Sequence, residues 1–136
     1  MIQRVQTIWM ILAAVIIFLT LKLPFYSGTL ASDNTYHELL ATDNFVILLL
    51  TSALGTGILI NIFLYKHRSI QFRILIFAIL AECVIIFLYI NATSKYATGN
   101  YGIWSVLHLL VIVFLTMAAK GIYNDSKLIK ESNRLR

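Results

Sequence analysis

Four long apolar runs constrain this chain more than any other feature of its sequence. They cover residues 5–23, 45–64, 74–92 and 103–119. Each is close to the length of about 20 residues that an α-helix needs to cross a bilayer. Every backbone N–H and C=O group in lipid needs a partner within the protein, so each run is expected to be helical. The sequence therefore predicts an all-α fold, a bundle of four transmembrane helices.

The composition agrees with lipid as the main solvent of this chain. Of its 136 residues, 60% are hydrophobic and 12% are charged, whereas a typical soluble domain has about 45–50% and about 25%. One Pro and six Gly leave little material for long loops. We expect a single integral membrane domain over residues 1–136, and the single cysteine, Cys83, excludes a disulfide framework.

Lys and Arg residues are distributed very unequally between the two sides of the predicted bundle. One side holds nine: Arg4, Lys66, Arg68, Arg73, Lys120, Lys127, Lys130, Arg134 and Arg136. The other side holds only Lys22 and Lys95. Positive residues in short segments favour the cytoplasmic side. We therefore expect both termini to be cytoplasmic, with residues 120–136 forming a basic cytoplasmic helical tail.

The first apolar run has a second interpretation, a cleaved signal peptide, because Thr29 and Ala31 are small residues at suitable cleavage spacing. The run is longer than the 7–15 apolar residues of a typical signal, and Lys22, near its end, lies where a cleavage region is normally uncharged. A retained helix is the favoured interpretation. The segments 25–44 and 93–102 are predicted to be outer loops, and residues 36–40 are expected to form a short interfacial turn.

Glu82 is the residue within the apolar runs that most needs an explanation. A carboxylate at the centre of a membrane span costs about 2.5 kcal/mol or more, so it is expected to face the bundle and to be partnered or protonated. Ser52 and Thr56 lie at a similar expected depth, and His108 lies closer to the outer surface. A hydrogen-bonded structural carboxylic acid is favoured over a proton or ion pathway, because a pathway usually contains several ionisable groups in series.

The second run carries small residues at a spacing of four, Ala53 and Gly57, followed by Asn61. Such a face lets helix backbones approach closely, and an asparagine can form a hydrogen bond to a neighbouring helix. We predict that this face packs against the third or first span. Whether the contact lies within one chain or between two copies is open.

No cofactor, metal site or catalytic arrangement is expected. The three histidines are His37, His67 and His108, and they do not place two haem ligands at a common depth. Catalytic motifs and phosphate-binding glycine loops are absent from the sequence. The basic tail lacks a stacking platform or groove-reading fold, so nucleic-acid binding is not expected.

Three segments of the chain carry a family resemblance. The chain opens with MIQRVQT, its central turn over residues 65–73 reads YKHRSIQFR, and residues 125–136 read DSKLIKESNRLR. Together they resemble the family known as domain of unknown function 4293, small four-helix membrane proteins typical of Bacteroidota. The resemblance implies a multi-pass protein of the bacterial inner membrane, and it implies no reaction, substrate or cofactor.

The segments that carry the resemblance lie on the predicted cytoplasmic side. We therefore predict a non-enzymatic accessory or scaffold subunit that docks a membrane-protein partner, a second copy of itself or anionic inner-leaflet lipid. The predicted docking residues are Arg68, Arg73, Asp125, Lys127, Lys130, Arg134 and Arg136. The alternative is a small transporter or channel with Glu82 as an intramembrane proton or ion site. Asp125 or Ser126 could cap a separate tail helix, or the fourth helix could continue through them.

Overall fold

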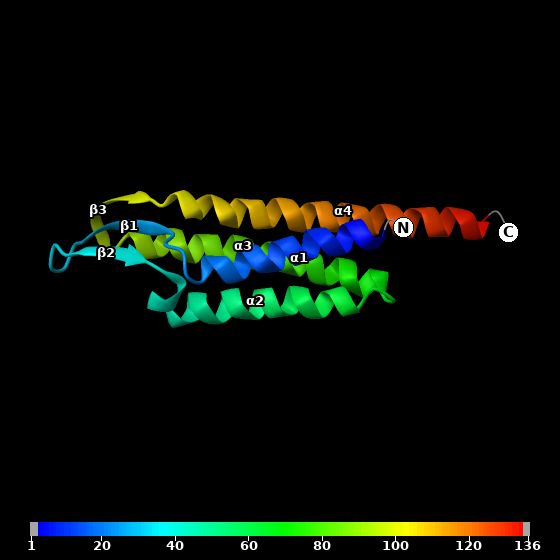
Figure 1. Cartoon of the computed structure of the whole chain (residues 1–136), viewed down its shortest axis with the longest axis horizontal. Helices are drawn as coiled ribbons and strands as arrows, with labels where there is room; N and C mark the ends of the chain where they lie inside the picture. Colours follow the sequence, from blue (N-terminus) through cyan, green and yellow to red (C-terminus); the bar gives the residue numbers. More distant parts are fainter. Residues whose placement is uncertain (1–2, 135–136) are drawn as a thin grey trace.

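The computed structural model describes residues 3–134 and shows a long helical bundle with a small sheet at one end (Figure 1). The helices are α1 (Gln3–Thr20), α2 (Phe45–Phe63), α3 (Arg68–Thr93) and α4 (Val106–Arg134). The strands are β1 (Tyr26–Leu30), β2 (Tyr36–Leu39) and β3 (Tyr96–Tyr101), and short 3₁₀ turns cover Ala41–Asp43 and Ile103–Ser105.

Three of the helices contain segments that are long and apolar enough to cross a membrane. These segments are Phe45–Phe63, Arg68–Thr93 and Ile103–Ile129, whereas the apolar part of α1, Val5–Thr20, is shorter. The predicted first span was expected to reach residue 23, but α1 ends at Thr20. Pro24 accounts for part of this difference, because the residue before a proline disfavours helical backbone angles.

The helices pack as a closed ring. The most extensive helix contacts are α1 with α4, α1 with α2, α3 with α4 and α2 with α3. Met10, Ile17, Leu75, Val111 and Leu115 are among the fully buried side chains at these contacts. Phe63, Phe77 and Phe87 point outwards and are 66–79% exposed. A water-soluble bundle would bury such side chains, so this outer surface suits lipid.

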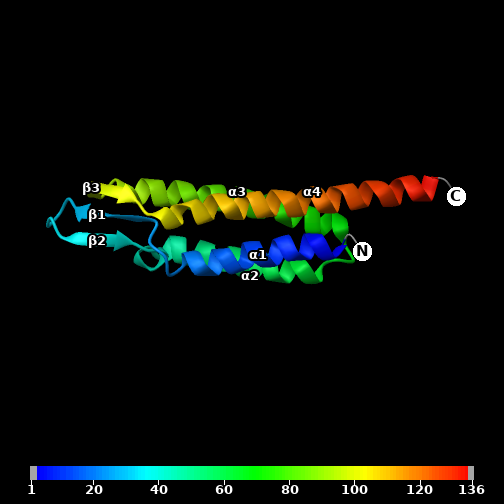
Figure 2. The same ribbon diagram turned by 45° about the horizontal axis from the view of Figure 1, so that its top comes forward.

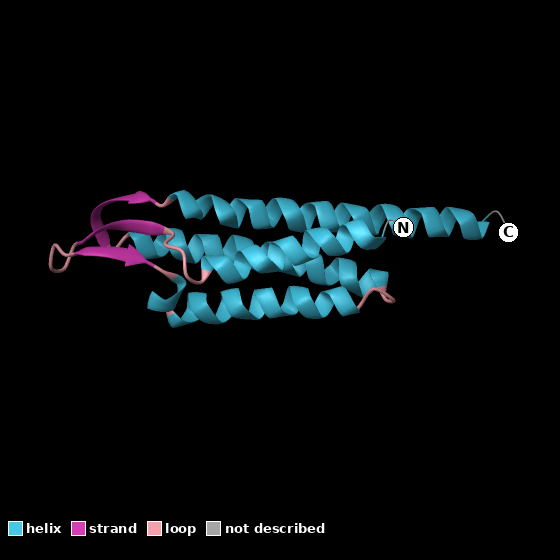
Figure 3. Cartoon of the chain, viewed as in Figure 1, coloured by secondary structure: helices cyan, strands magenta, loops and turns pink. Residues whose placement is uncertain are grey.

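The three strands form an antiparallel sheet of order β2-β1-β3, so the prediction of an all-α fold is wrong in this respect. All three strands lie at the end of the bundle opposite the last turns of α4 (Figure 3). Residues 36–39 are a strand and not the expected interfacial turn. Gly28 pairs with Gly99 in the centre of the sheet, and a Cβ at Gly99 would lie 2.5 Å from the Ser27 carbonyl oxygen.

The tail continues the fourth helix, because α4 is one unbroken helix from Val106 to Arg134. It extends past the start of α1 and past the α2–α3 turn, as Figures 1 and 2 show. Neither Asp125 nor Ser126 begins a new helix, and the Ser126 hydroxyl donates to the Ile122 carbonyl oxygen at 2.9 Å. The first and last helices thus present their free ends at the same end of the bundle (Figure 1).

Candidate functional site

The first polar cluster lies inside the bundle, below the sheet. Glu82 is fully buried in α3, and its Oε1 lies 2.6 Å from Nδ1 of His108 in the first turn of α4. His108 is only 3% exposed. A buried carboxylate in a membrane span requires a partner, and His108 supplies a hydrogen bond across the α3–α4 contact. A hydrogen-bonded Glu82 was favoured from the sequence, with His108 at a shallower depth than Ser52 and Thr56, but His108 is the residue that contacts it.

Aromatic side chains enclose the Glu82–His108 pair. The Phe25 ring stacks on Tyr89 with a centroid distance of 4.4 Å and meets His108 edge-on at 5.5 Å. The sheet holds Phe25 in place, because its N–H donates to the Leu39 carbonyl oxygen and its own carbonyl oxygen accepts from the Gly102 N–H. The end of the sheet nearest the helices therefore covers this polar cluster.

Two buried oxygens of the first cluster have no hydrogen-bond partner among the described residues. They are Oε2 of Glu82 and the hydroxyl of Tyr89. Both lie on the same face of α3, because residues seven apart are two helical turns apart. The cluster thus has hydrogen-bonding capacity beyond the contact with His108.

Ser52 and Thr56 do not take part in this cluster, so their expected partnership with Glu82 is wrong. The Ser52 hydroxyl donates to the Leu48 carbonyl oxygen at 2.7 Å, and the Thr56 hydroxyl donates to the Ser52 carbonyl oxygen at 2.9 Å. Both hydroxyls are satisfied within α2. Hydroxyls in membrane helices commonly bond to a carbonyl one turn back, and depth alone cannot show which way they point.

Only part of the predicted packing face of α2 lies against another helix. A Cβ at Gly57 would meet nothing within 4 Å, and Ala53 and Gly57 instead line an open groove of about 210 Å³ between α2 and α3. The close helix contact is at Gly55, where a Cβ would lie 2.9 Å from the Phe18 ring of α1. Asn61 is buried as expected, and its Nδ2 donates to the Gln71 carbonyl oxygen at 3.2 Å.

A second polar cluster joins α1, α3 and α4 at the opposite end of the bundle. Nε2 of Gln6 donates to Oδ2 of Asp125 at 2.6 Å. The Arg68 guanidinium lies 3.9 Å from the same oxygen. Gly121 permits the approach of Gln6, because a Cβ there would lie 2.7 Å from the Gln6 Cγ. Asp125 is only 6% exposed, so it holds the bundle together and is not available as a surface docking residue.

A reciprocal amide contact links α2 and α3 close to this second cluster. Nε2 of Gln71 donates to the Asn61 carbonyl oxygen at 3.2 Å, and it also lies 3.8 Å from the Met10 sulfur of α1. Sequence reasoning did not identify Gln6 or Gln71. Their signal was present, because glutamine at the edge of an apolar run needs hydrogen-bond partners when it is buried.

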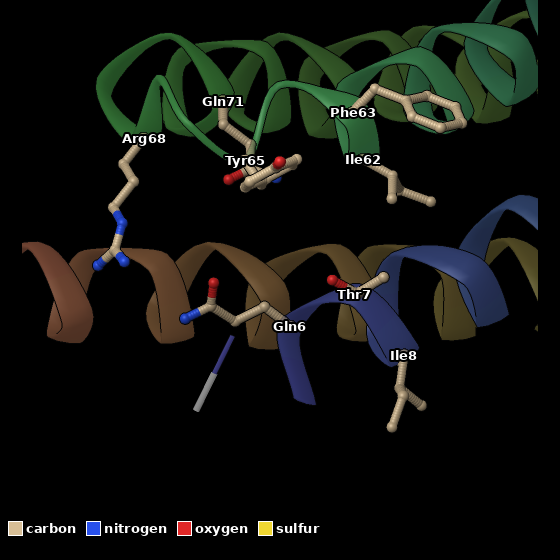
Figure 4. A pocket seen from close by; sticks show the side chains of 8 residues that line it. All are labelled: Gln6, Thr7, Ile8, Ile62, Phe63, Tyr65, Arg68 and Gln71. Atoms are coloured by element: carbon tan, nitrogen blue, oxygen red, sulfur yellow. The ribbon is translucent and has the colours of Figure 1, made fainter. Parts of the chain in front are cut away.

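Two cavities flank Arg68. The larger, about 510 Å³, lies between α1 and the α2–α3 corner. Figure 4 shows Gln6 and Thr7 on one side of it, Tyr65 and Gln71 on the other, and Arg68 reaching towards α4. The smaller cavity, about 400 Å³, lies between the start of α3 and α4. Both volumes fall within the range of about 300–1,000 Å³ that is typical of small-molecule sites.

The remaining predicted docking residues fall into two groups. Arg73 and Lys127 are exposed, and Lys127 lies 3.9 Å from Glu131 one helical turn later. Lys130 and Arg134 belong to α4, but the structure does not describe their side chains, and Arg136 lies outside the described residues. Among the described residues, no three His, Cys, Asp or Glu side chains are close enough to share a metal ion.

The chain belongs to the family described as a domain of unknown function (DUF4293), whose sequence profile matches residues 2–135. Comparison with curated proteins and with solved structures gave no significant match. The family description assigns no activity to this chain, and the membrane-protein architecture is indicated by the three long apolar helices.

Proposed function

We propose that this DUF4293 protein is a non-enzymatic accessory subunit of an assembly in the bacterial inner membrane. In this proposal the projecting end of α4 binds a protein partner on the cytoplasmic side. The observation that carries the proposal is the continuation of α4 as one straight helix beyond the other three (Figure 2).

Helix lengths support an upright orientation with α4 projecting from the bilayer. α2 has 19 residues and is about 28 Å long at ~1.5 Å per residue. α4 has 29 residues and is about 43 Å long, which exceeds a hydrocarbon core of about 30 Å. The excess lies at the end that carries Lys66, Arg68, Arg73 and Lys127. The positive-inside rule therefore supports a cytoplasmic position for this end.

The projecting part of α4 carries an apolar surface that would be left in water. Leu128 and Ile129 are 54% and 45% exposed, next to the exposed Lys127. Adjacent apolar side chains on a helix, flanked by charge, suit a hydrophobic groove of a protein partner. The axis of α4 points away from the end of the bundle. This surface is therefore better placed to contact a cytoplasmic protein than to contact the bilayer.

A small transporter or channel is the second candidate, and the 2.6 Å contact between Glu82 and His108 is the observation that favours it. Ser52 and Thr56 do not extend this pair into a polar pathway, because they bond within α2. Complementation by Glu82→Gln separates the two candidates. Normal growth with this variant is expected for an accessory subunit, whereas loss of growth with intact folding would favour transport.

Removal of residues 128–136 is expected to lower the amount of co-purified partner at least about tenfold, since apolar anchors dominate binding energy. This truncation retains Asp125 and Lys127, so the second polar cluster stays complete. The measurement is quantitative mass spectrometry after purification in a mild detergent at native expression. The double variant Leu128→Ala/Ile129→Ala is expected to act in the same direction.

The matched control is Leu109→Ala/Leu110→Ala, which alters another adjacent and exposed apolar pair on the same helix. This control is expected to retain the partner within about twofold, since isolated surface changes have small effects. Recovery of only further copies of this chain, or equal losses in both double variants, would contradict the accessory function.

A further inference from the structure

The smaller cavity beside Arg68 has a composition that no role described so far explains. It occupies about 400 Å³ between the start of α3 and residues 123–127 of α4. Its lining consists of two cations, two hydroxyl side chains and two aromatic rings: Arg68, Lys127, Ser69, Ser126, Phe72 and Tyr123. This lining contains two cationic side chains and no carboxylate.

The cationic groups keep donors available for an anion. Arg68 lies 3.9 Å from Asp125, which is longer than a hydrogen bond, and the same Asp125 oxygen accepts from Gln6 at 2.6 Å. The contact of Lys127 with Glu131 is also 3.9 Å, between side chains that are 67% and 59% exposed. Exposed pairs of this kind are weak. A guanidinium and an ammonium together match the oxygens of a phosphate group.

The aromatic wall indicates which source of phosphate the cavity suits. The centroids of the Phe72 ring on α3 and the Tyr123 ring on α4 lie 6.2 Å apart, and the two rings are tilted by 41° to each other. Ile76, one turn further along α3 from Phe72, is 42% exposed and continues the apolar surface towards the middle of the bundle. A free phosphate ion makes no use of such a surface, whereas a lipid places its phosphate beside its apolar chains.

We propose that this cavity binds the phosphate of an anionic phospholipid, with Arg68 and Lys127 at the headgroup and Phe72 and Tyr123 beside the start of the acyl chains. The inference rests on the orientation in the proposed function, which places Arg68 at the level of the inner-leaflet headgroups. It does not depend on the protein partner of α4.

Native mass spectrometry of the full-length protein tests this site, with phosphatidylglycerol, phosphatidylethanolamine and inorganic phosphate as separate probes. Phosphatidylglycerol is expected to bind about tenfold more tightly than phosphatidylethanolamine, and an equal concentration of inorganic phosphate is expected not to displace it. Lys127→Gln is expected to weaken phosphatidylglycerol binding about fivefold, as for loss of one basic group at an anionic surface. Ser69→Asp, which adds a negative charge to the lining, is expected to abolish it.

Lys66→Gln is the matched control, because Lys66 is an exposed cation at the same end that does not line the cavity. It is expected to leave phosphatidylglycerol binding within about twofold, since exposed charges interact weakly. Equal binding of both lipids, displacement by inorganic phosphate, or equal effects of Lys66→Gln and Lys127→Gln would overturn the proposal. The double variant Leu128→Ala/Ile129→Ala keeps the whole lining and adds no charge to it, so it is expected to lose the protein partner and retain the lipid.

Discussion

Glu82→Ala is expected to lower the free energy of unfolding by about 3 kcal/mol, the upper end of the range found when a buried hydrogen-bonding group loses its partner. His108 would remain buried after this change, without the oxygen that now lies 2.6 Å from its Nδ1. The cavity below Phe25 and Tyr89 would add to the loss. Reversible unfolding of the purified protein in mixed micelles measures the effect.

A double-mutant cycle with His108→Ala identifies the origin of this effect. Ordinary polar pairs between membrane helices have an average coupling energy of only about 0.6 kcal/mol. We expect a coupling energy above about 1.5 kcal/mol for Glu82 and His108, because both side chains are buried. Ser52→Ala is the matched control, since its hydroxyl bonds within its own helix, and it is expected to change stability by less than about 0.5 kcal/mol. A coupling energy near zero would show that Glu82 and His108 do not stabilise each other.

Asp125→Ala is expected to lower the free energy of unfolding by about 2–3 kcal/mol, the upper part of the range for hydrogen bonds to charged groups. The change removes the acceptor of the Gln6 amide at 2.6 Å and leaves Arg68 without its nearby carboxylate. Most of the expected loss comes from Gln6, because the Arg68 contact is longer and its side chain is 26% exposed. The same unfolding measurement applies.

Asn124→Ala is the control for Asp125→Ala, because Asn124 is the preceding residue and is exposed on α4. It is expected to change stability by less than about 0.5 kcal/mol. Gln6→Ala should cause most of the loss seen for Asp125→Ala, and the double variant should cause little more than either change alone. Equal stability of the Asn124 and Asp125 variants would mean that the second polar cluster does not hold α1 against α4.

The helical part of this fold was predictable because it follows from local properties of the chain. Apolar runs of membrane-spanning length lie between polar segments, and most residues of each run are helical. The sheet was not predictable in the same way, because Gly28 pairs with Gly99 across about seventy residues. Its strands also lack a strict alternation of polar and apolar residues, which is the usual signal of a half-buried strand.

The candidate sites were also predictable only in part. Glu82 was identifiable because a carboxylate in lipid is costly. Its partner was not, because the contact with His108 depends on how β3 connects the end of α3 to the start of α4. Asp125 was predicted to be a docking residue because it lies in the tail segment that carries the family resemblance. The structure buries it, because Gly121 on the same helix leaves room for the Gln6 side chain.

We propose that the sheet lies outside the inner membrane and that the end with Arg68 and the projecting α4 lies in the cytoplasm. Labelling with a membrane-impermeant maleimide tests it directly, in a Cys83→Ser background that removes the single native thiol. Asn100→Cys reports on the sheet, and His67→Cys and Ser132→Cys report on the opposite end, all at exposed positions. We predict that intact spheroplasts label only the Asn100 variant, and that the other two label after lysis. Labelling of the His67 and Ser132 variants in intact spheroplasts would contradict this orientation.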